Sequence, residues 1–194
     1  MTAAELRARR HWIFDLDGTL TVAVHDFGAL RARLGLPQGR PILEAIAARP
    51  EHEQAALHAG VEAWELEMVA FARPADGAAK LLDALATHRR AVLTRNTSAV
   101  ALATLDAVGL SERFDPVFGR HDAAAKPSPE GIERVLAAWR AAPEDAVMVG
   151  DYGFDLEAGR AAGIATVLVD AHGHGKWRPL ADLVVPSLRA LAED

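Results

Sequence analysis

Cysteine is absent from the 194-residue sequence, and lysine occurs only at Lys80, Lys126 and Lys176. Without cysteine the chain has no disulfide, no thiolate zinc site and no cysteine nucleophile, so its chemistry must use oxygen and nitrogen groups. The sequence contains no apolar run of about 18 residues, the length of a membrane span, and its first residues lack the apolar segment of a signal peptide. We therefore expect a cytoplasmic protein with no membrane partner.

An excess of positive charge is also missing. The 21 Lys and Arg residues are outnumbered by 27 Asp and Glu residues, which gives a formal net charge of -6. This balance disfavours sequence-independent binding to nucleic acid or to an anionic membrane surface. With 51% hydrophobic residues the chain can bury a core. Its length suits one domain with room for an insertion and carries no signal for a particular oligomeric state.

Apolar runs alternate with amphipathic segments along most of the chain. Runs bounded by turn or charged residues are typical of buried strands, and they occur at residues 11–15, 91–94, 146–150, 164–170 and 183–185. Between them, apolar residues recur at helical spacing in residues 77–88, 98–108, 129–141 and 154–162. This order predicts an α/β fold with a doubly wound, mainly parallel sheet.

One segment interrupts the alternation. Between residues 21 and 75 no long strand-like run occurs, and helical spacing predicts helices near residues 27–34, 42–48 and 51–71. This insertion begins close to the end of the first strand, where ligands bind in open α/β sheets. We therefore expect a helical cap at residues 21–75 over a core formed by residues 1–20 and 76–194. The alternative is an ordinary helical excursion within one domain.

Two aspartates follow the first strand directly, in the sequence DLDGTL. Asp15 and Asp17 stand where both carboxylates can reach one small ligand, and Gly18 permits close approach of the backbone. The alternative is a polar turn in which the two aspartates only cap local amides.

Three further segments combine polar side chains with a helix start. Thr94-Arg95-Asn96 ends a strand and offers a hydroxyl and backbone amides to an anion. Lys126 precedes a helix in KPSPE, and Asp151 and Asp155 lie between a strand and a helix in GDYGFD. Taken singly, each has a purely structural explanation: a helix cap, a solvated lysine, or an acid that stabilises a helix dipole.

Taken together, the four segments indicate a metal and phosphate site. In a doubly wound sheet they all emerge at the carboxyl edge of the strands, so four carboxylates would crowd together and require a cation. Oxygen ligands favour a hard ion, and Mg²⁺ suits an open site that phosphate and water complete. The candidate metal ligands are Asp15, Asp17, Asp151 and Asp155. The candidate phosphate- or substrate-binding residues are Gly18, Thr94, Arg95, Asn96 and Lys126. By contrast, His172 and His174 lack a third ligand and are poor evidence for a second metal site.

DLDGTL, a threonine after a strand, KPSPE and GDYGFD, in this order, resemble the four signature motifs of the haloacid dehalogenase superfamily. The resemblance spans about residues 11 to 190 and implies a Rossmann-like core with a C1-type helical cap. PADGAAKLLDAL and ADLVVPSL are similar to the phosphoglycolate-phosphatase-like branch. Two features depart from the family: Arg95 follows Thr94 where many relatives have asparagine, and the insertion is short for a full C1 cap.

The resemblance implies specific roles for the candidate residues. Asp15 would attack phosphorus and form an aspartyl-phosphate, and Asp17 would protonate the leaving oxygen and later deprotonate water. Mg²⁺ would be held by a carboxylate oxygen of Asp15, the main-chain carbonyl of Asp17 and Asp151, with Asp155 in support. Thr94 and Lys126 would complete the catalytic set by holding the phosphoryl group. Because dehalogenases of the family lack the aspartate at the position of Asp17, dehalogenation is disfavoured.

We therefore predict a Mg²⁺-dependent phosphatase that acts on small phosphorylated metabolites. One alternative is a phosphomutase of the same fold, which would pass its phosphoryl group to a sugar rather than to water. Another is a phospho-accepting signalling module like a response-regulator receiver, although its acceptor follows a later strand and it lacks a cap. The complete set of motifs disfavours a catalytically idle scaffold.

Overall fold

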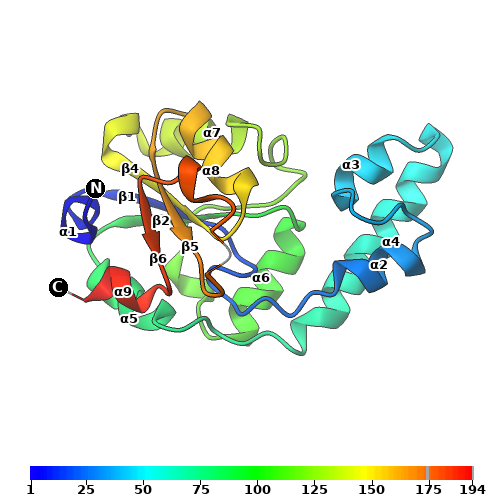
Figure 1. Cartoon of the computed structure of the whole chain (residues 1–194), viewed down its shortest axis with the longest axis horizontal. Helices are drawn as coiled ribbons and strands as arrows, with labels where there is room; N and C mark the ends of the chain where they lie inside the picture. The colour runs from blue at the N-terminus through cyan, green and yellow to red at the C-terminus, as the bar shows by residue number, and fades with distance from the viewer. Residues whose placement is uncertain (174, 194) are drawn as a thin grey trace.

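The fold is built on one parallel sheet. The computed structural model describes residues 1–173 and 175–193, and within them six strands pair in the order β3-β2-β1-β4-β5-β6, all parallel (Figure 1). The strands are β1 (His11–Phe14), β2 (Arg89–Leu93), β3 (Val117–Phe118), β4 (Ala146–Gly150), β5 (Ala165–Val169) and β6 (Leu183–Val185). The predicted α/β fold with a doubly wound parallel sheet is confirmed. His174, one of the two histidines weighed above, lies outside the described residues.

Strand β3 was not predicted from the sequence. It has only two residues, which are too few to show an alternating or continuous apolar pattern. Its position at the edge of the sheet beside β2 still matters for the site. The amide of Thr94 donates to the carbonyl of Phe118 at 3.0 Å, so the pairing of β2 with β3 extends to the first residue beyond β2.

Helices cover both faces of the sheet. They are α1 (Ala3–Arg7), α5 (Ala78–Ala84), α6 (Ser98–Ala107), α7 (Glu130–Trp139), α8 (Gly153–Ala161) and α9 (Arg189–Ala192). Alternate residues of β1 enter different cores: Trp12 and Phe14 pack with α5, α6 and α9, whereas Ile13 packs with α7 and α8. Figure 1 shows these two groups of helices on opposite sides of the sheet. Burial on both faces explains why the central strands read as continuous apolar runs.

The insertion after β1 is helical. It contains α2 (Phe27–Arg33), α3 (Ile42–Ala47) and α4 (Glu51–Val69), which bury a small apolar cluster of their own that includes Leu30, Ile46 and Trp64. Figure 1 shows this group of helices to one side of the sheet. Among the described residues, no helix is long and apolar enough to cross a membrane.

The two connections of the insertion run beside each other. The amide of Val22 donates to the carbonyl of Arg73, and the amide of Ala75 donates to the carbonyl of Leu20, both at 2.9 Å. These hydrogen bonds lie next to the predicted boundaries of the cap, at residues 21 and 75. We retain that division into core and cap as a proposal, and refer below to residues 21–75 as the cap.

Candidate active site

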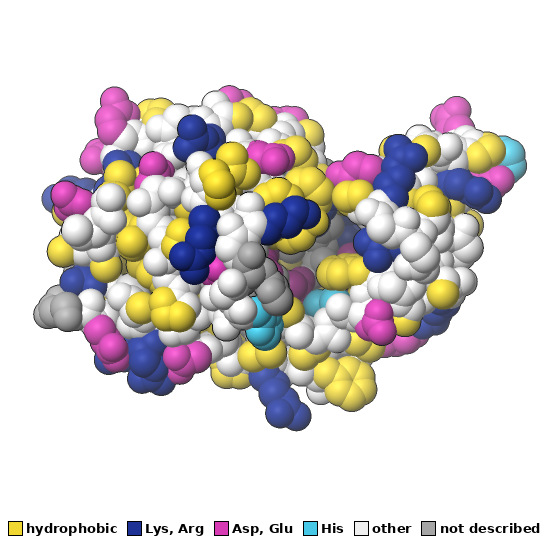
Figure 2. Space-filling model, in the orientation of Figure 1, with side chains coloured by type: hydrophobic (Ala, Val, Ile, Leu, Met, Phe, Trp, Pro, Cys, Tyr) yellow, Lys and Arg dark blue, Asp and Glu magenta, His cyan; other side chains and the backbone are white. Residues whose placement is uncertain are grey.

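A cavity of about 460 Å³ lies between the carboxyl edge of the sheet and the cap. It appears as the hollow between the two parts of the molecule in Figure 2. The structure brings eight of the candidate residues to this one cavity, although they come from four distant segments: Asp15, Asp17, Thr94, Arg95, Asn96, Lys126, Asp151 and Asp155. Gly18, the ninth, lies directly behind Asp151.

Lys126 is buried and bridges two aspartates. Its Nζ lies 2.5 Å from Oδ1 of Asp15 and 2.6 Å from Oδ1 of Asp155, and it donates a third hydrogen bond of 2.5 Å to the carbonyl of Leu93. The side chain is only 1% exposed, so it is not the solvated loop lysine that its sequence context also allowed. Burial alone would lower the pKa of Lys126, but the charges of Asp15 and Asp155 outweigh it and raise the pKa.

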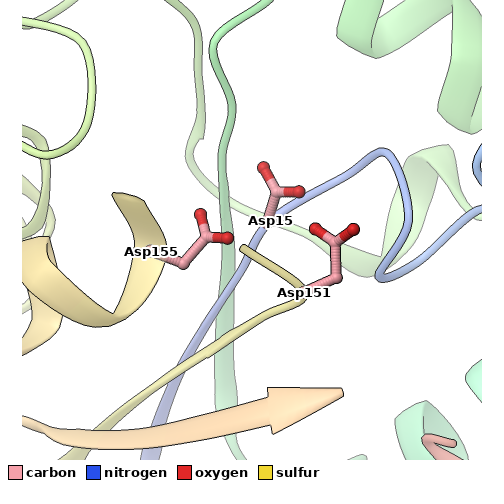
Figure 3. Close-up of side chains that lie close together, drawn as sticks. All are labelled: Asp15, Asp151 and Asp155. Carbon is pink, nitrogen blue, oxygen red and sulfur yellow. The ribbon is translucent and has the colours of Figure 1, made fainter. Parts of the chain in front are cut away.

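Three carboxylates converge beside Lys126. Oxygens of Asp15, Asp151 and Asp155 all lie within 4.8 Å of one another, and Figure 3 shows the three side chains directed toward a common point. Asp15 leaves β1, Asp151 follows β4, and Asp155 stands in the first turn of α8, where it also accepts a hydrogen bond of 3.1 Å from the amide of Tyr152. The strand ends and one helix start therefore assemble the acidic group.

Gly18 is required for this approach. Its φ of +86° belongs to the left-handed region, and a Cβ atom at this position would lie 2.2 Å from Oδ2 of Asp151. A larger residue would push Asp151 out of place. The glycine of DLDGTL thus allows the first motif to sit against the fourth.

The acidic group carries more negative charge than Lys126 can balance. Burial, reinforced by Asp155 and Asp17, raises the pKa of Asp15 to about 7 even though Lys126 opposes the shift. Burial, together with Asp15 and Asp155, raises the pKa of Asp151 to about 8. Such shifts mean that the charged forms of Asp15 and Asp151 are disfavoured unless another cation is present. A set of oxygen donors with surplus negative charge fits Mg²⁺.

Asp17 lies apart from the three converging carboxylates and has different partners. Nδ2 of Asn96 donates a hydrogen bond of 2.7 Å to its Oδ2, and the hydroxyl of Thr21 lies 3.4 Å from its Oδ1. Nδ1 of His25, at the start of the cap, is 3.7 Å from the same Oδ1. Asp17 is thus oriented by the segment after β2 and faces the cavity beside the cap.

Thr94 is buried, with a side chain that lines the cavity. Its Oγ1 accepts a hydrogen bond of 3.2 Å from the amide of Asn96. The hydroxyl proton is therefore free of that contact and can be donated to a ligand.

Arg95 contacts the cap rather than standing unpaired. Its Nη2 donates to both carboxylate oxygens of Glu44 in α3, at 2.8 and 2.7 Å, and its Nη1 donates to the carbonyl of Lys126. The guanidinium also covers the ring of Phe154, with 4.4 Å from Cζ to the ring centroid. Arg95 lines the cavity, but its charge is matched by Glu44.

A second ion pair between core and cap was missed by the sequence analysis. Arg120, in the loop after β3, donates from Nη1 to both oxygens of Glu65 in α4, at 2.9 and 2.8 Å. The two side chains are only 3% and 8% exposed. Thr97 adds a third contact, since its hydroxyl donates to Glu62 of α4 at 3.0 Å. Residues 55 positions apart carry no local signal of such a pair.

The Glu65 carboxylate has an unusual environment. Burial raises its pKa to about 7, although Arg120 opposes the shift, and the nearby charges of Asp17 and Glu62 raise it further. Glu65 also lines the cavity. An acid from the cap therefore sits near the catalytic candidates with its charge only partly balanced.

Comparison with known proteins finds a matching protein family and similar proteins. The family described as haloacid dehalogenase-like hydrolase matches residues 29–169. Validoxylamine A 7'-phosphate phosphatase of Streptomyces hygroscopicus subsp. limoneus is 32% identical over 176 residues, which cover 80% of this chain and 83% of that protein.

Solved structures resemble the whole fold. A hydrolase from Pseudomonas syringae superposes with a TM-score of 0.81 at 19% identity and covers 94% of this chain and 96% of its own. A predicted phosphoglycolate phosphatase from Haemophilus somnus 129PT gives a TM-score of 0.75 at 20% identity, with the same coverage of 94% and 96%. Because the sequence identity is so low, these similarities show the fold alone.

Proposed function

The chain belongs to the haloacid dehalogenase-like hydrolase family, and we propose that it is a Mg²⁺-dependent phosphatase. Its substrates are small-molecule phosphate monoesters, hydrolysed through an aspartyl-phosphate on Asp15, as in phosphoglycolate-phosphatase-like relatives. The observation that carries the proposal is the convergence of Asp15, Asp151 and Asp155 beside the buried Lys126 in the lining of one cavity. That a 32% identical relative bears the name of a phosphate-ester phosphatase supports it.

Asp15 is the nucleophile in this proposal. Lys126 holds its Oδ1, which leaves the other oxygen to attack phosphorus. A bond forms between this oxygen and phosphorus while the bond from phosphorus to the ester oxygen breaks. The alcohol leaves, and the phosphoryl group remains on Asp15.

Asp17 serves as the acid and then as the base. It gives a proton to the ester oxygen as that oxygen departs, and it later takes a proton from the water that attacks the aspartyl-phosphate. The second attack breaks the bond between Asp15 and phosphorus and releases inorganic phosphate. The hydrogen bond from Asn96 supports this role because it fixes the carboxylate of Asp17 in the cavity.

Mg²⁺ would be held by Asp15, the main-chain carbonyl of Asp17 and Asp151, with Asp155 in support. When bound, it would offset the charge of the carboxylates and of the phosphoryl group. Lys126 and the hydroxyl of Thr94 would bind the phosphoryl oxygens, near the backbone of Gly18 and beside Asn96. We assign Arg95 a positioning role at this end of the cavity, since its guanidinium holds Glu44 of the cap.

Phosphate release from p-nitrophenyl phosphate and a panel of phosphate esters tests the proposal. We expect turnover with Mg²⁺, no turnover with EDTA, and a loss of roughly 10⁴-fold or more in kcat for Asp15→Asn. Asp106→Asn, an exposed aspartate in α6, is the matched control and should keep wild-type activity. Activity in Asp15→Asn equal to that of the control would contradict the proposal, and isomerisation of a sugar phosphate without phosphate release would favour a phosphomutase.

A further inference from the structure

The cavity also has an apolar lining. It comes from α2, α3 and α4 on the cap side and from the start of α8 on the core side, and it includes Phe27, Leu30, Ile42, Leu43, Val61 and Phe154. We propose that the alcohol part of the substrate is an apolar, ring-bearing group, and that these walls bind it. The inference rests on the proposed phosphatase function and adds the substrate class.

Aromatic side chains stand on both walls, and each packs against neighbouring side chains. On the cap side, the ring of Phe27 lies 5.6 Å from that of His25 and 6.0 Å from that of Trp64. On the core side, Phe154 contacts Arg95 and lies 5.0 Å from the ring of Tyr152. Phe27 is nonetheless 47% exposed, so it presents apolar surface that a ligand can cover. Flat apolar groups gain most from such surfaces.

Most of the positive charges around the cavity are already matched. Among the described residues that line it, Lys126 is paired with Asp15 and Asp155, and Arg95 is paired with Glu44. Arg31, among the same residues, forms no ion pair with a carboxylate; its Nε donates to the carbonyl of Arg40 at 2.7 Å. A ligand carboxylate placed against the apolar walls, away from Arg31, would lose water without gaining a partner.

The size of the cavity also favours a ring-bearing alcohol group. Sites that enclose drug-sized ligands have volumes of about 300–1,000 Å³, and the cavity measures about 460 Å³. A two-carbon ester would fill little of it and would leave the apolar walls in contact with water. A ring-bearing alcohol group removes that surface from water, which is the main source of affinity for such walls.

The test compares three esters that share a phosphate on a primary carbon: ethyl phosphate, 2-phenylethyl phosphate and 2-phosphoglycolate. With the full chain and Mg²⁺, we expect kcat/KM for 2-phenylethyl phosphate to exceed that for ethyl phosphate by about tenfold or more. We expect 2-phosphoglycolate to be no better than ethyl phosphate. Phosphate release from none of the three would contradict the proposed function and this inference together. Hydrolysis with 2-phosphoglycolate preferred would contradict this inference alone.

Two variants test whether Phe27 is responsible for the preference for 2-phenylethyl phosphate over ethyl phosphate. Phe27→Ala should reduce the ratio of kcat/KM for 2-phenylethyl to ethyl phosphate by about threefold or more. Phe71→Ala, 60% exposed and outside the cavity lining, should leave that ratio unchanged. An unchanged ratio in Phe27→Ala would overturn the assignment of the wall. A preference for 2-phosphoglycolate that disappears in Arg31→Gln would overturn the apolar class and identify an anionic one.

Discussion

The two walls of the cavity use charge in opposite ways. On the core wall, charged side chains face the cavity and pair with one another, as Asp15 and Asp155 do with Lys126. On the cap wall, most side chains that face the cavity are apolar, and Glu44 and Glu65 of the cap contact arginines of the core. Charged side chains of the core wall belong to the proposed catalytic site, whereas the two glutamates of the cap attach the cap to the core.

The contacts that attach the cap also differ in burial. The Glu65–Arg120 pair is 8% and 3% exposed, whereas the Glu44–Arg95 pair is 39% and 21% exposed. The Arg33–Glu67 pair, which joins two helices within the cap, is more than half exposed on both sides. Because water screens exposed charges, the strength and pH sensitivity of an ion pair should follow its burial.

The largest effect is expected on the core wall, where Lys126→Met removes the cation between Asp15 and Asp155. Asp155, which is buried, and Asp15, which is 13% exposed, would then lack a charged partner, so we expect the free energy of unfolding at pH 8 to fall by about 3–5 kcal/mol. kcat should also fall, by roughly 10²–10³-fold. Urea denaturation and phosphate release measure the two effects. Lys80→Met removes an exposed partner of Glu193 and is the control; an equal loss of stability in both variants would refute the prediction.

The contribution of the buried Glu65–Arg120 pair to stability should depend on pH. Glu65 titrates near pH 4.5 when unfolded and at about 7 when folded, so the folded protein holds this proton to higher pH. Its contribution to stability is complete below pH 4.5 and is lost as the pH rises through 7. We expect the unfolding free energy of the wild type, relative to Glu65→Gln, to fall between pH 5 and pH 8 by up to about 3 kcal/mol.

Urea denaturation at the two pH values measures this difference. Glu67→Gln provides the control on the same helix, because the Arg33 hydrogen bond lowers the pKa of Glu67 from 4.5, so Glu67 stays ionised and should give no fall in stability between pH 5 and pH 8. A wild-type stability that stays constant relative to Glu65→Gln would show that the buried pair does not titrate in this range.

The metal ligands of the core wall can be tested without a catalytic assay. At a concentration 100 times its Kd, a ligand that binds only the folded state stabilises it by about 2.7 kcal/mol, so Mg²⁺ should raise the melting temperature of the wild type. Gly18→Ala should lose this rise, because a Cβ atom would displace Asp151. Gly109→Ala is the matched control, since Gly109 also has a positive φ but no neighbour within 4 Å. Equal Mg²⁺ shifts in both variants would contradict the role of Asp151.

The smallest effect is expected at the partly exposed attachment. Glu44→Gln weakens the contact with Arg95, and we expect KM for p-nitrophenyl phosphate to rise about two- to fivefold, the range of a partly exposed ion pair. kcat should change less, since no group at the phosphoryl end is removed. Steady-state kinetics measures both constants. Glu67→Gln, whose pair lies wholly within the cap, should leave KM at the wild-type value. A KM for Glu44→Gln within error of that control would contradict the positioning role of the Glu44–Arg95 pair.

The sequence by itself determined the sheet and the order in which polar segments leave it. Strong apolar runs marked the central strands, and only β3, with two residues, was too short to detect. Because parallel strands end at one edge, the order of motifs was enough to expect Asp15, Thr94 and Asp151 together. These predictions succeeded because each depends on local pattern and on a general property of parallel sheets.

Only the tertiary structure decided which groups face each other across the cavity. The sequence predicted Lys126 as a phosphate-binding residue but not that it is buried between two aspartates, and it left open whether Arg95 contacts phosphate or substrate, whereas in the structure Arg95 is paired with Glu44. The Glu65–Arg120 pair had no sequence signal at all. Such contacts depend on how the cap packs against the core. Because that packing joins residues more than 50 positions apart, neither periodicity nor motif spacing can predict these contacts.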